Sequence, residues 1–287
     1  MGRSFWRGLF FAGGFAATCA AGPATAQTWE TVGRPSSGPP QVFGGAANGC
    51  IAGAVQLPLE GRGYQAVRVS RNRYWGHPDT VEFVVDLAAQ LAQRGFPAIY
   101  VGDMGQPRGG RMPYGHASHQ NGLDVDIWFN LRPKAPLPAA QREVIETPLL
   151  VRRDRTIDYG EFDRRHVEML RIAATQPRVE RIFVNFAIKR ELCNIVTGDR
   201  RWLQRIRPWY GHDEHFHVRM ACPAGSPGCV RQPALPPGDG CDELESWFRP
   251  PPPQVAVATR VRPRPRPPAP PQCAAVLRGI VPASLAR

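Results

Sequence analysis

The chain has 287 residues, of which 36 are lysine or arginine and 24 are aspartate or glutamate, so its formal net charge is +12. No stretch approaches the ~20 consecutive apolar residues of a membrane-spanning helix, which argues against an integral membrane segment. The basic charge favours polyanionic surroundings, but the arginines are scattered or lie among prolines, and no nucleic-acid-binding motif is recognisable. We therefore expect no nucleic-acid partner, and other anionic polymers are the better fit.

The N-terminus, residues 1–26, has the features of a cleaved secretory signal. Arg3 and Arg7 form a basic start, apolar and small residues follow at 9–20, and Ala24-Thr25-Ala26 fits a small-residue cleavage site. We expect the mature chain, 27–287, to be a single domain of sufficient length for one sizeable core.

Export would place the cysteines in an oxidising compartment. Cleavage removes Cys19, and the six that remain form an even number, which predicts disulfides in an exported chain. The alternative is zinc ligation by cysteine, but no two cysteines have the C-x2-C spacing of such sites. The six are Cys50, Cys193, Cys222, Cys229, Cys241 and Cys273.

The first half of the mature chain contains one clear helix. Residues 28–48 are rich in glycine, proline and serine, which predicts an extended surface coil. Apolar residues at helical spacing predict a helix over 79–94, with Asp79 as its cap and Glu82 completing a capping box. A strand is expected at 96–103.

A stretch rich in histidine and aspartate follows the glycine-rich loop at 105–110. His116 and His119 come first, and beyond them apolar residues alternate with polar ones as far as Phe129. This period of two predicts a strand with both of its carboxylates, Asp124 and Asp126, on one face. His119 would lie in the loop before the strand, close enough to share a centre with Asp126.

A second histidine-rich stretch occupies residues 211–219. Phe216 and Val218 alternate with His215, His217 and Arg219, so both histidines should lie on one face of a strand. Imidazole and carboxylate both suit zinc, and a catalytic zinc has three protein ligands and an open position. His119 and Asp126 would supply two ligands, and either His215 or His217 would supply the third.

The remaining segments surround these two stretches. A helix is predicted at 159–174, and we expect His166 inside it to be exposed to solvent. Alternation predicts a strand at 181–189, and 225–240 is expected to be loop. The proline- and arginine-rich segment 249–271 cannot form a helix or central strand and is interpreted as a strap over the domain. The aromatic residues flanking the motifs are Trp75, Trp128, Trp209 and Tyr210, of which the last two are the best candidates for walls of a substrate groove.

Helices interleaved with irregular strands predict a single α+β domain. The spacing His119-x6-Asp126, followed far downstream by His215-x-His217, resembles the zinc metallopeptidases named for lysostaphin, D-Ala-D-Ala peptidases and sonic hedgehog. The strings Gly-His-Ala-Ser-His-Gln-x-Gly-Leu-Asp-Val-Asp-Ile-Trp and Trp-Tyr-Gly-His-Asp-x-His-Phe-His-Val-Arg resemble penicillin-insensitive murein endopeptidases. The resemblance covers nearly the whole mature chain and implies a small antiparallel sheet that carries zinc, flanked by helices and long loops.

The same resemblance implies three disulfides and a set of residue roles. The implied disulfides are Cys50–Cys273, Cys193–Cys241 and Cys222–Cys229. The implied zinc ligands are His119, Asp126 and His217, with His116 either a fourth ligand or a neighbour of the ligands. His215 is the first choice for proton transfer, and His212 would hydrogen-bond the oxyanion or the water.

Two acidic residues are assigned supporting roles. Asp124 would orient a ligand imidazole. Glu214 stands three residues before His217, where carboxypeptidases of the wider group carry a glutamate base. In a regular strand Glu214 points away from His217, so Glu214 is the second choice of base after His215.

The resemblance implies a periplasmic zinc endopeptidase that hydrolyses D-alanyl–meso-diaminopimelate cross-links between the stem peptides of peptidoglycan. One rival is a D,D-carboxypeptidase that trims terminal D-alanine. Another is a catalytically silent, zinc-containing protein that only binds the wall. The sequence leaves the oligomeric state open, with a dimer among the alternatives.

Overall fold

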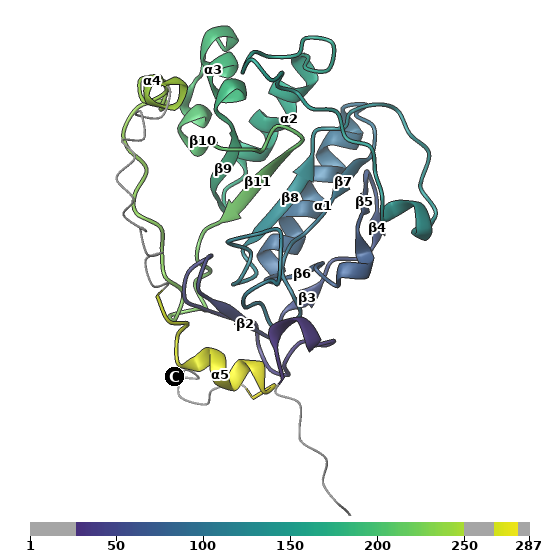
Figure 1. Ribbon diagram of the computed structural model, residues 1–287, viewed down its shortest axis with the longest axis vertical. Coiled ribbons are helices and arrows are strands. Elements are labelled where there is room, and N and C mark those ends of the chain that lie inside the picture. The colour runs from purple at the N-terminus through teal and green to yellow at the C-terminus, as the bar shows by residue number, and fades with distance from the viewer. Residues whose placement is uncertain (1–26, 250–266, 281–287) are drawn as a thin grey trace, which may run out of the picture.

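A seven-stranded mixed sheet forms the centre of the computed structural model, which describes residues 27–249 and 267–280 (Figure 1). Its strand order is β10-β9-β11-β8-β7-β5-β4, and two separate pairs, β1-β2 and β3-β6, lie outside it. The strands are β1 (Gln41–Phe43), β2 (Cys50–Ala52), β3 (Val55–Gln56), β4 (Glu60–Gly61), β5 (Tyr64–Ala66), β6 (Trp75–Gly76), β7 (Ile99–Val101), β8 (Asp124–Trp128), β9 (Val179–Asn185), β10 (Ile206–Trp209) and β11 (His215–Met220).

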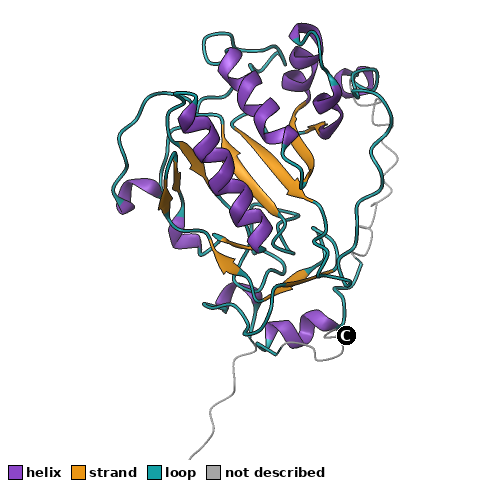
Figure 2. Ribbon diagram, turned by 180° about the vertical axis from the view of Figure 1, so that it is seen from behind, coloured by secondary structure: helices purple, strands orange, loops and turns teal. Residues whose placement is uncertain are grey.

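Helices cover one face of the sheet, and loops cover the other. Figure 2, seen from behind, shows α1 covering the strands and running in much the same direction as they do, with α2 and α3 beside it. The helices are α1 (Pro78–Gln93), α2 (Arg164–Thr175), α3 (Phe186–Ile195), α4 (Glu245–Phe248) and α5 (Gln272–Leu277). Among the described residues, no helix is long and apolar enough to cross a membrane.

The core lies between α1 and the centre of the sheet. Val125 and Ile127 of β8 are fully buried in the same cluster as Leu87 and Leu91 of α1. Burying a side chain of this size contributes about 1.5–3 kcal/mol. Since successive residues of a strand face opposite sides, this packing turns the even-numbered residues of β8 towards the loop-covered face.

The predicted α+β class is confirmed, and the sheet adds a detail to it. β11 pairs antiparallel with both β8 and β9, so the middle of the sheet is antiparallel, as expected. Further out, β9 pairs parallel with β10 and β5 pairs parallel with β7. Each parallel pair is joined by a helix-containing connection, which is the usual way to bring two strands into parallel register.

The helix predicted at 79–94 is α1, but its cap differs from the prediction. The backbone N–H of Asp79 donates to Nδ1 of His77 at 3.2 Å, so His77 caps the helix instead of Asp79. His77 precedes Pro78, whose ring favours the first helical position because it lacks an N–H that would need a partner there. The strand expected at 96–103 is shorter in the structure and is limited to β7.

Three predictions in the later part of the chain differ from the structure. The helix predicted at 159–174 begins only at Arg164, where the Asp163 side chain caps α2 by accepting from the N–H of Arg165. His166 is buried, with 2% of its surface exposed, because its Nε2 is 2.9 Å from the carbonyl oxygen of Phe129 and its Nδ1 accepts from the N–H of Asp163. The strand expected at 181–189 ends at Asn185, where α3 begins. The Asn185 side chain accepts from the N–H of Ala187, and asparagine is among the favoured residues for capping a helix in this way.

The three disulfides join the pairs that the family resemblance implied. Cys50–Cys273 fastens α5 to β2, Cys193–Cys241 fastens α3 to the segment before α4, and Cys222–Cys229 closes a short loop after β11. Such links stabilise a fold mainly by restricting the unfolded chain. The signal sequence predicted at 1–26 and residues 250–266 of the expected strap lie outside the described residues.

Candidate metal centre

The pairing of β8 with β11 brings the two predicted stretches together. Asp126 lies directly opposite His217, Trp128 opposite His215, and Asp124 opposite Arg219. All six side chains share the face of the sheet that points away from α1, because they alternate with the core residues. The polar faces predicted from alternation are therefore the two halves of one site.

His119 approaches this face from the loop before β8. Its backbone lies in the left-handed region, with φ 64°, a conformation that costs a non-glycine residue on the order of 1–3 kcal/mol. The Asp124 carboxylate accepts from the His119 backbone N–H at 2.9 Å and holds this conformation. Nδ1 of His119 is 2.7 Å from the carbonyl oxygen of Met104, which only accepts hydrogen bonds. Nδ1 therefore carries the proton, and the lone pair of Nε2 points towards β11.

His217 is oriented in a similar way by Asp124. Nε2 of His217 is 3.2 Å from Oδ1 of Asp124, and Arg219 donates to both oxygens of the same carboxylate at 2.7 and 3.1 Å. Burial raises the pKa of Asp124, but Arg219 and His217 outweigh it and hold the pKa well below its usual range. An ionised Asp124 fixes the proton of His217 on Nε2, so the lone pair of Nδ1 faces His119.

Three lone-pair atoms therefore meet at one point. Nε2 of His119 is 3.2 Å from Nδ1 of His217, and each lies 3.4 Å from Oδ1 of Asp126. Among the described residues, this buried Asp126 oxygen has no hydrogen-bond partner. These separations are longer than most hydrogen bonds, whereas zinc bonds of about 2.05 Å place tetrahedral ligands about 3.3 Å apart. The three residues fit a metal ion of this kind.

The electrostatic field favours a positive charge at the same point. Burial lowers the pKa of His119, but the carboxylates of Asp126, Asp124 and Asp103 outweigh it and raise the pKa to about 9. Burial dominates at His217 and lowers its pKa to about 4. The carboxylates that favour a proton on His119 would equally stabilise a metal cation between the two rings.

His116 lies beside the triangle, at its more exposed edge. Its ring centroid is 4.3 Å from that of His119, and its Nδ1 is 3.6 Å from Oδ2 of Asp126. Its Nε2 is 2.9 Å from Oδ2 of Asp103, which also accepts from Arg73 at 2.8 Å. Burial raises the pKa of Asp103, but these bonds lower it to about 2, so the carboxylate is ionised and Nδ1 of His116 is free to face the metal position.

His215, Glu214 and His212 lie on the other side of Asp126. Nε2 of His215 is 3.7 Å from Oδ2 of Asp126, while its Nδ1 is 3.6 Å from Oε1 of Glu214. Glu214 also accepts from the Thr147 hydroxyl at 3.0 Å, so its carboxylate faces His215 and Thr147. His212 has φ 55°, and its Nδ1 is 2.9 Å from the carbonyl oxygen of Tyr210. Its ring centroid is 5.0 Å from that of His215.

A cavity of about 510 Å³ opens over these residues, and His119 and Asp126 are buried beneath it. Of the four aromatic residues considered for its walls, Trp209 lines it, while Tyr210 is exposed nearby. Trp128 is buried, with the Arg68 guanidinium 4.9 Å over its ring, and Trp75 donates to Asn72. The cavity is lined by Ala47, Gly115, His116, Ala117, Ser118, Arg181, Phe183, Trp209, His212, His217, Arg219 and Gln232.

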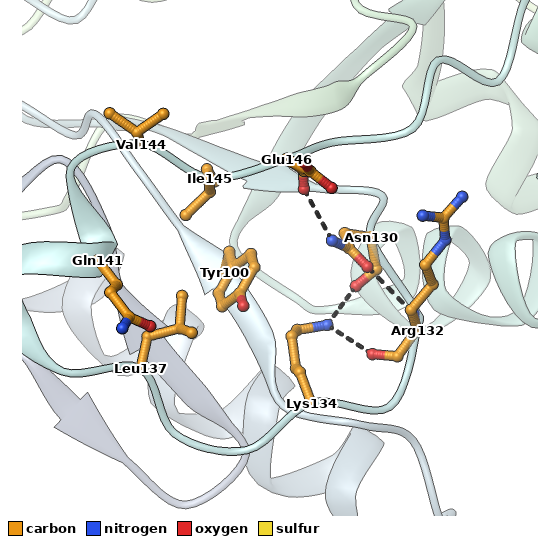
Figure 3. Close-up of a pocket in the computed structure, with 9 residues that line it drawn as sticks. All are labelled: Tyr100, Asn130, Arg132, Lys134, Leu137, Gln141, Val144, Ile145 and Glu146. Atoms are coloured by element: carbon orange, nitrogen blue, oxygen red, sulfur yellow. Dashed lines mark hydrogen bonds between the residues drawn. The ribbon is translucent and has the colours of Figure 1, made fainter.

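A second cavity of about 460 Å³ lies beside Tyr100, at a loop that follows β8 (Figure 3). Lys134 crosses it and donates to the carbonyl oxygens of Asn130 and Arg132 at 2.7 and 3.0 Å. Burial lowers the pKa of Lys134 to about 8. No histidine lines this cavity, and its central cation is bonded to the chain's own carbonyls, so Lys134 holds the loop in place.

Two residues of the centre were missed in the sequence. Arg219 alternates with His215 and His217, so the same period that placed them on one face could have placed Arg219 opposite Asp124. Asp103 had no such signal, because it follows β7 in a different part of the chain and meets His116 only through the fold.

Comparison with known proteins agrees with this arrangement. A family profile described as penicillin-insensitive murein endopeptidase matches residues 42–278. A protein of that name from Yersinia pestis is 44% identical over 263 residues, covering 88% of this chain and 90% of the relative. The protein of the same name from Klebsiella pneumoniae (strain 342) is 42% identical over 268 residues, which cover 90% of this chain and 93% of that relative. The protein of the same name from Haemophilus influenzae is 44% identical over 227 residues, which cover 78% of this chain and 79% of that relative.

Proposed function

The chain belongs to the family of penicillin-insensitive murein endopeptidases, and we propose that it uses zinc to hydrolyse D-alanyl–meso-diaminopimelate cross-links in peptidoglycan. The chain is a murein endopeptidase, and its substrate is the cell wall. A wall enzyme acts outside the cytoplasm, and the three disulfides fit an oxidising compartment. Export to the periplasm by cleavage after residue 26 is part of the proposal.

The observation that carries the zinc assignment is the triangle of lone-pair atoms. His119, Asp126 and His217 would hold the ion, with Asp124 fixing the tautomer of His217 and Met104 fixing that of His119. Three protein ligands of this kind leave an open position, as catalytic zinc sites require. When bound, zinc would polarise the scissile carbonyl and lower the pKa of a bound water to about 7.

His215 is the proposed proton carrier. Its Nε2 is 3.7 Å from Oδ2 of Asp126, one of the three proposed metal ligands, and its Nδ1 faces Glu214. Carboxylates at Asp126 and Glu214 outweigh the effect of burial and raise the pKa of His215. Glu214 acts through His215 by holding the ring, because its carboxylate is turned to His215 and Thr147.

His212 is proposed to hydrogen-bond the water that attacks the substrate. Its Nδ1 is engaged by the Tyr210 carbonyl, and the residue lines the cavity beside His217. Burial lowers the pKa of His212, and its neutral ring, with the proton on Nδ1, leaves the lone pair of Nε2 to accept a hydrogen bond from that water. His116 completes the centre, either as a fourth ligand before substrate binds or as a support for Asp126.

Digestion of purified cross-linked muropeptide dimers tests the proposal. Mature protein with intact disulfides is assayed as isolated, after treatment with a chelator, and after addition of zinc, with products identified by mass spectrometry. Loss of dimer cleavage on chelation and its return with zinc are expected. Release of only terminal D-alanine would indicate a carboxypeptidase, and wall binding without cleavage would indicate a silent binding protein.

A further inference from the structure

Three arginines lie next to one another on neighbouring strands, close to the metal centre. Arg219 of β11 lies directly opposite Arg181 of β9, and Arg207 of β10 lies opposite Phe183 of β9. Like charges placed directly opposite each other on adjacent strands are destabilising unless counter-charges accompany them. Whether each of the three arginines has a carboxylate partner therefore determines whether it is available to bind an anion.

Among the residues that the structure describes, two of the arginines have carboxylate partners and Arg181 has none. Arg219 is bonded to Asp124 at 2.7 Å, and Arg207 is bonded to Glu243 at 2.5 Å. Within the described residues, no carboxylate oxygen lies within 4.0 Å of an Arg181 nitrogen. Its Nη2 donates to the carbonyl of Pro233, while its Nε is buried without a hydrogen-bond partner.

The surroundings of Arg181 disfavour its charge. Burial, together with the positive charges of Arg207 and Arg219, lowers the pKa of the Arg181 guanidinium. Glu180 is the nearest acid in the chain, but burial raises the pKa of its own carboxyl and it makes no ion pair with Arg181. A partly buried guanidinium whose Nε–H is buried and unpaired is stabilised when an anion binds its remaining N–H groups.

Arg181 faces the same cavity as the metal centre. Arg181, Arg219 and Gln232 line one part of the cavity, which His116, His212 and His217 also line. Because His217 lies opposite Phe183, Arg181 is its diagonal neighbour across the two strands, and such residues are about 7–8 Å apart. A group attached close to the scissile bond would lie within reach of the Arg181 side chain.

We propose that Arg181 binds a substrate carboxylate attached beside the scissile amide, and that this contact selects the free acid. The inference rests on the proposed function. In a D-alanyl–diaminopimelate link, the carbon that bears the scissile nitrogen also carries a carboxylate. A guanidinium recognises a carboxylate through paired N–H···O bonds, which an amide in the same place cannot reproduce.

Kinetics on two muropeptide dimers test this assignment, one with the free carboxylate and one with that carboxylate amidated. Wild-type protein should cleave the free acid with a kcat/KM about 10- to 100-fold higher than the amide, the usual range for a hydrogen-bonded charge pair. Arg181→Gln should lose that preference by slowing on the free acid only. Arg181→Lys should keep part of it, because the positive charge remains.

The matched control is Arg201→Gln, which alters an exposed arginine paired with Asp199 far from the cavity and should match wild type. Metal content and thermal midpoint of each variant show whether the fold and the centre are intact. Equal losses on both dimers, or full activity of Arg181→Gln on the free acid, would overturn the inference.

Affinity measurements separate this inference from the proposed function. The chelated wild-type protein, which cannot turn the dimers over, should bind the free acid more tightly than the amide, and chelated Arg181→Gln should bind both equally. This result supports the carboxylate site even if no zinc-dependent cleavage is observed. Equal affinity of chelated wild type for both dimers counts against it even if cleavage is observed.

Discussion

Two regions of the molecule each bury a histidine completely, and they do so in different ways. At the start of α2, His166 is 2% exposed, its Nε2 bonded to the Phe129 carbonyl and its Nδ1 to the Asp163 N–H. On the loop-covered face of the sheet, His119 is 0% exposed and bonded through Nδ1 to the Met104 carbonyl. Its second nitrogen faces the lone pairs of His217 and Asp126 instead of a donor.

The difference separates a structural histidine from a metal-binding one. Both nitrogens of His166 are satisfied by the protein, and burial lowers its pKa, so the neutral ring completes the packing of α2. At His119 the neutral ring turns a lone pair towards the lone pairs of His217 and Asp126, an arrangement that needs either a proton or a metal cation between them. Burial alone does not distinguish the two residues. They differ in whether each ring nitrogen has a hydrogen-bond partner of the opposite type.

The strongest test of this comparison is removal of His119. His119→Ala should lose its zinc and more than about a thousandfold of its dimer-cleaving activity, since loss of even one electrostatic stabiliser costs about 10²–10³. Metal analysis and kcat/KM are the measurements. His166→Leu serves as the buried-histidine control and should keep its metal. Full activity of His119→Ala would remove the basis for the metal centre.

The roles of His215 and Glu214 can be separated within the same region. His215→Ala should lower kcat by about 10²–10⁴, the usual contribution of a proton-transfer group. Glu214→Gln keeps a hydrogen-bonding side chain next to His215, and its loss should stay below about tenfold. Both variants should retain zinc. If the kcat of Glu214→Gln falls as far as that of His215→Ala, then Glu214 is the base and His215 has the supporting role.

A smaller effect is expected at Asp124, which touches both metal-facing histidines without facing the triangle. Asp124→Asn should weaken zinc binding by about 10–100-fold, because it no longer fixes the tautomer of His217. Titration with a competing chelator measures this affinity. Asp103→Asn, whose side chain contacts His116 but neither His119 nor His217, is the comparison and should have less influence. An unchanged affinity in Asp124→Asn would show that Arg219 and the backbone hold the site alone.

The smallest effect concerns stability at His166. His166→Leu leaves the buried Phe129 carbonyl without its donor, at a cost of about 1–3 kcal/mol in unfolding free energy above pH 7. The folded pKa is below the unfolded value near 6.5, so wild type should lose stability as pH falls from about 6.5 towards the folded pKa. The variant should lack this acid sensitivity. Denaturant unfolding from pH 8 to 5 with disulfides intact measures both effects.

Local patterns were sufficient for much of the fold around the site. Alternation located β8 and β11 and put Asp124 and Asp126 on one face, because a strand exposes every second residue to the same side. Helical spacing located α1 to within a residue at each end. Alternation alone misplaced the end of β9, because the capping of α3 by Asn185 overrides a pattern that also fits a strand.

The histidines show where local patterns stop. His166 was expected at the surface because its helix gave no indication of the Phe129 carbonyl, 37 residues earlier in the chain, which accepts a hydrogen bond from its Nε2–H. The capping of α1 by His77 was missed for a related reason, since Asp79 and Glu82 offered a capping box on their own. A side chain's hydrogen-bond partner depends on the geometry of the chain around it, which residue type alone does not supply.

The sequence by itself determined which side chains can bind a metal and on which faces of the strands they lie. Histidine and carboxylate at strand spacing indicate a metal centre, and the longer strings indicate the family, because both properties depend on short segments. The tertiary structure alone decided which nitrogen of each histidine carries a lone pair, that Asp103 supports His116, and that Arg181 faces the cavity without a carboxylate partner among the described residues. His119 and His217 are 98 residues apart, and their relation exists only once β8 and β11 have paired.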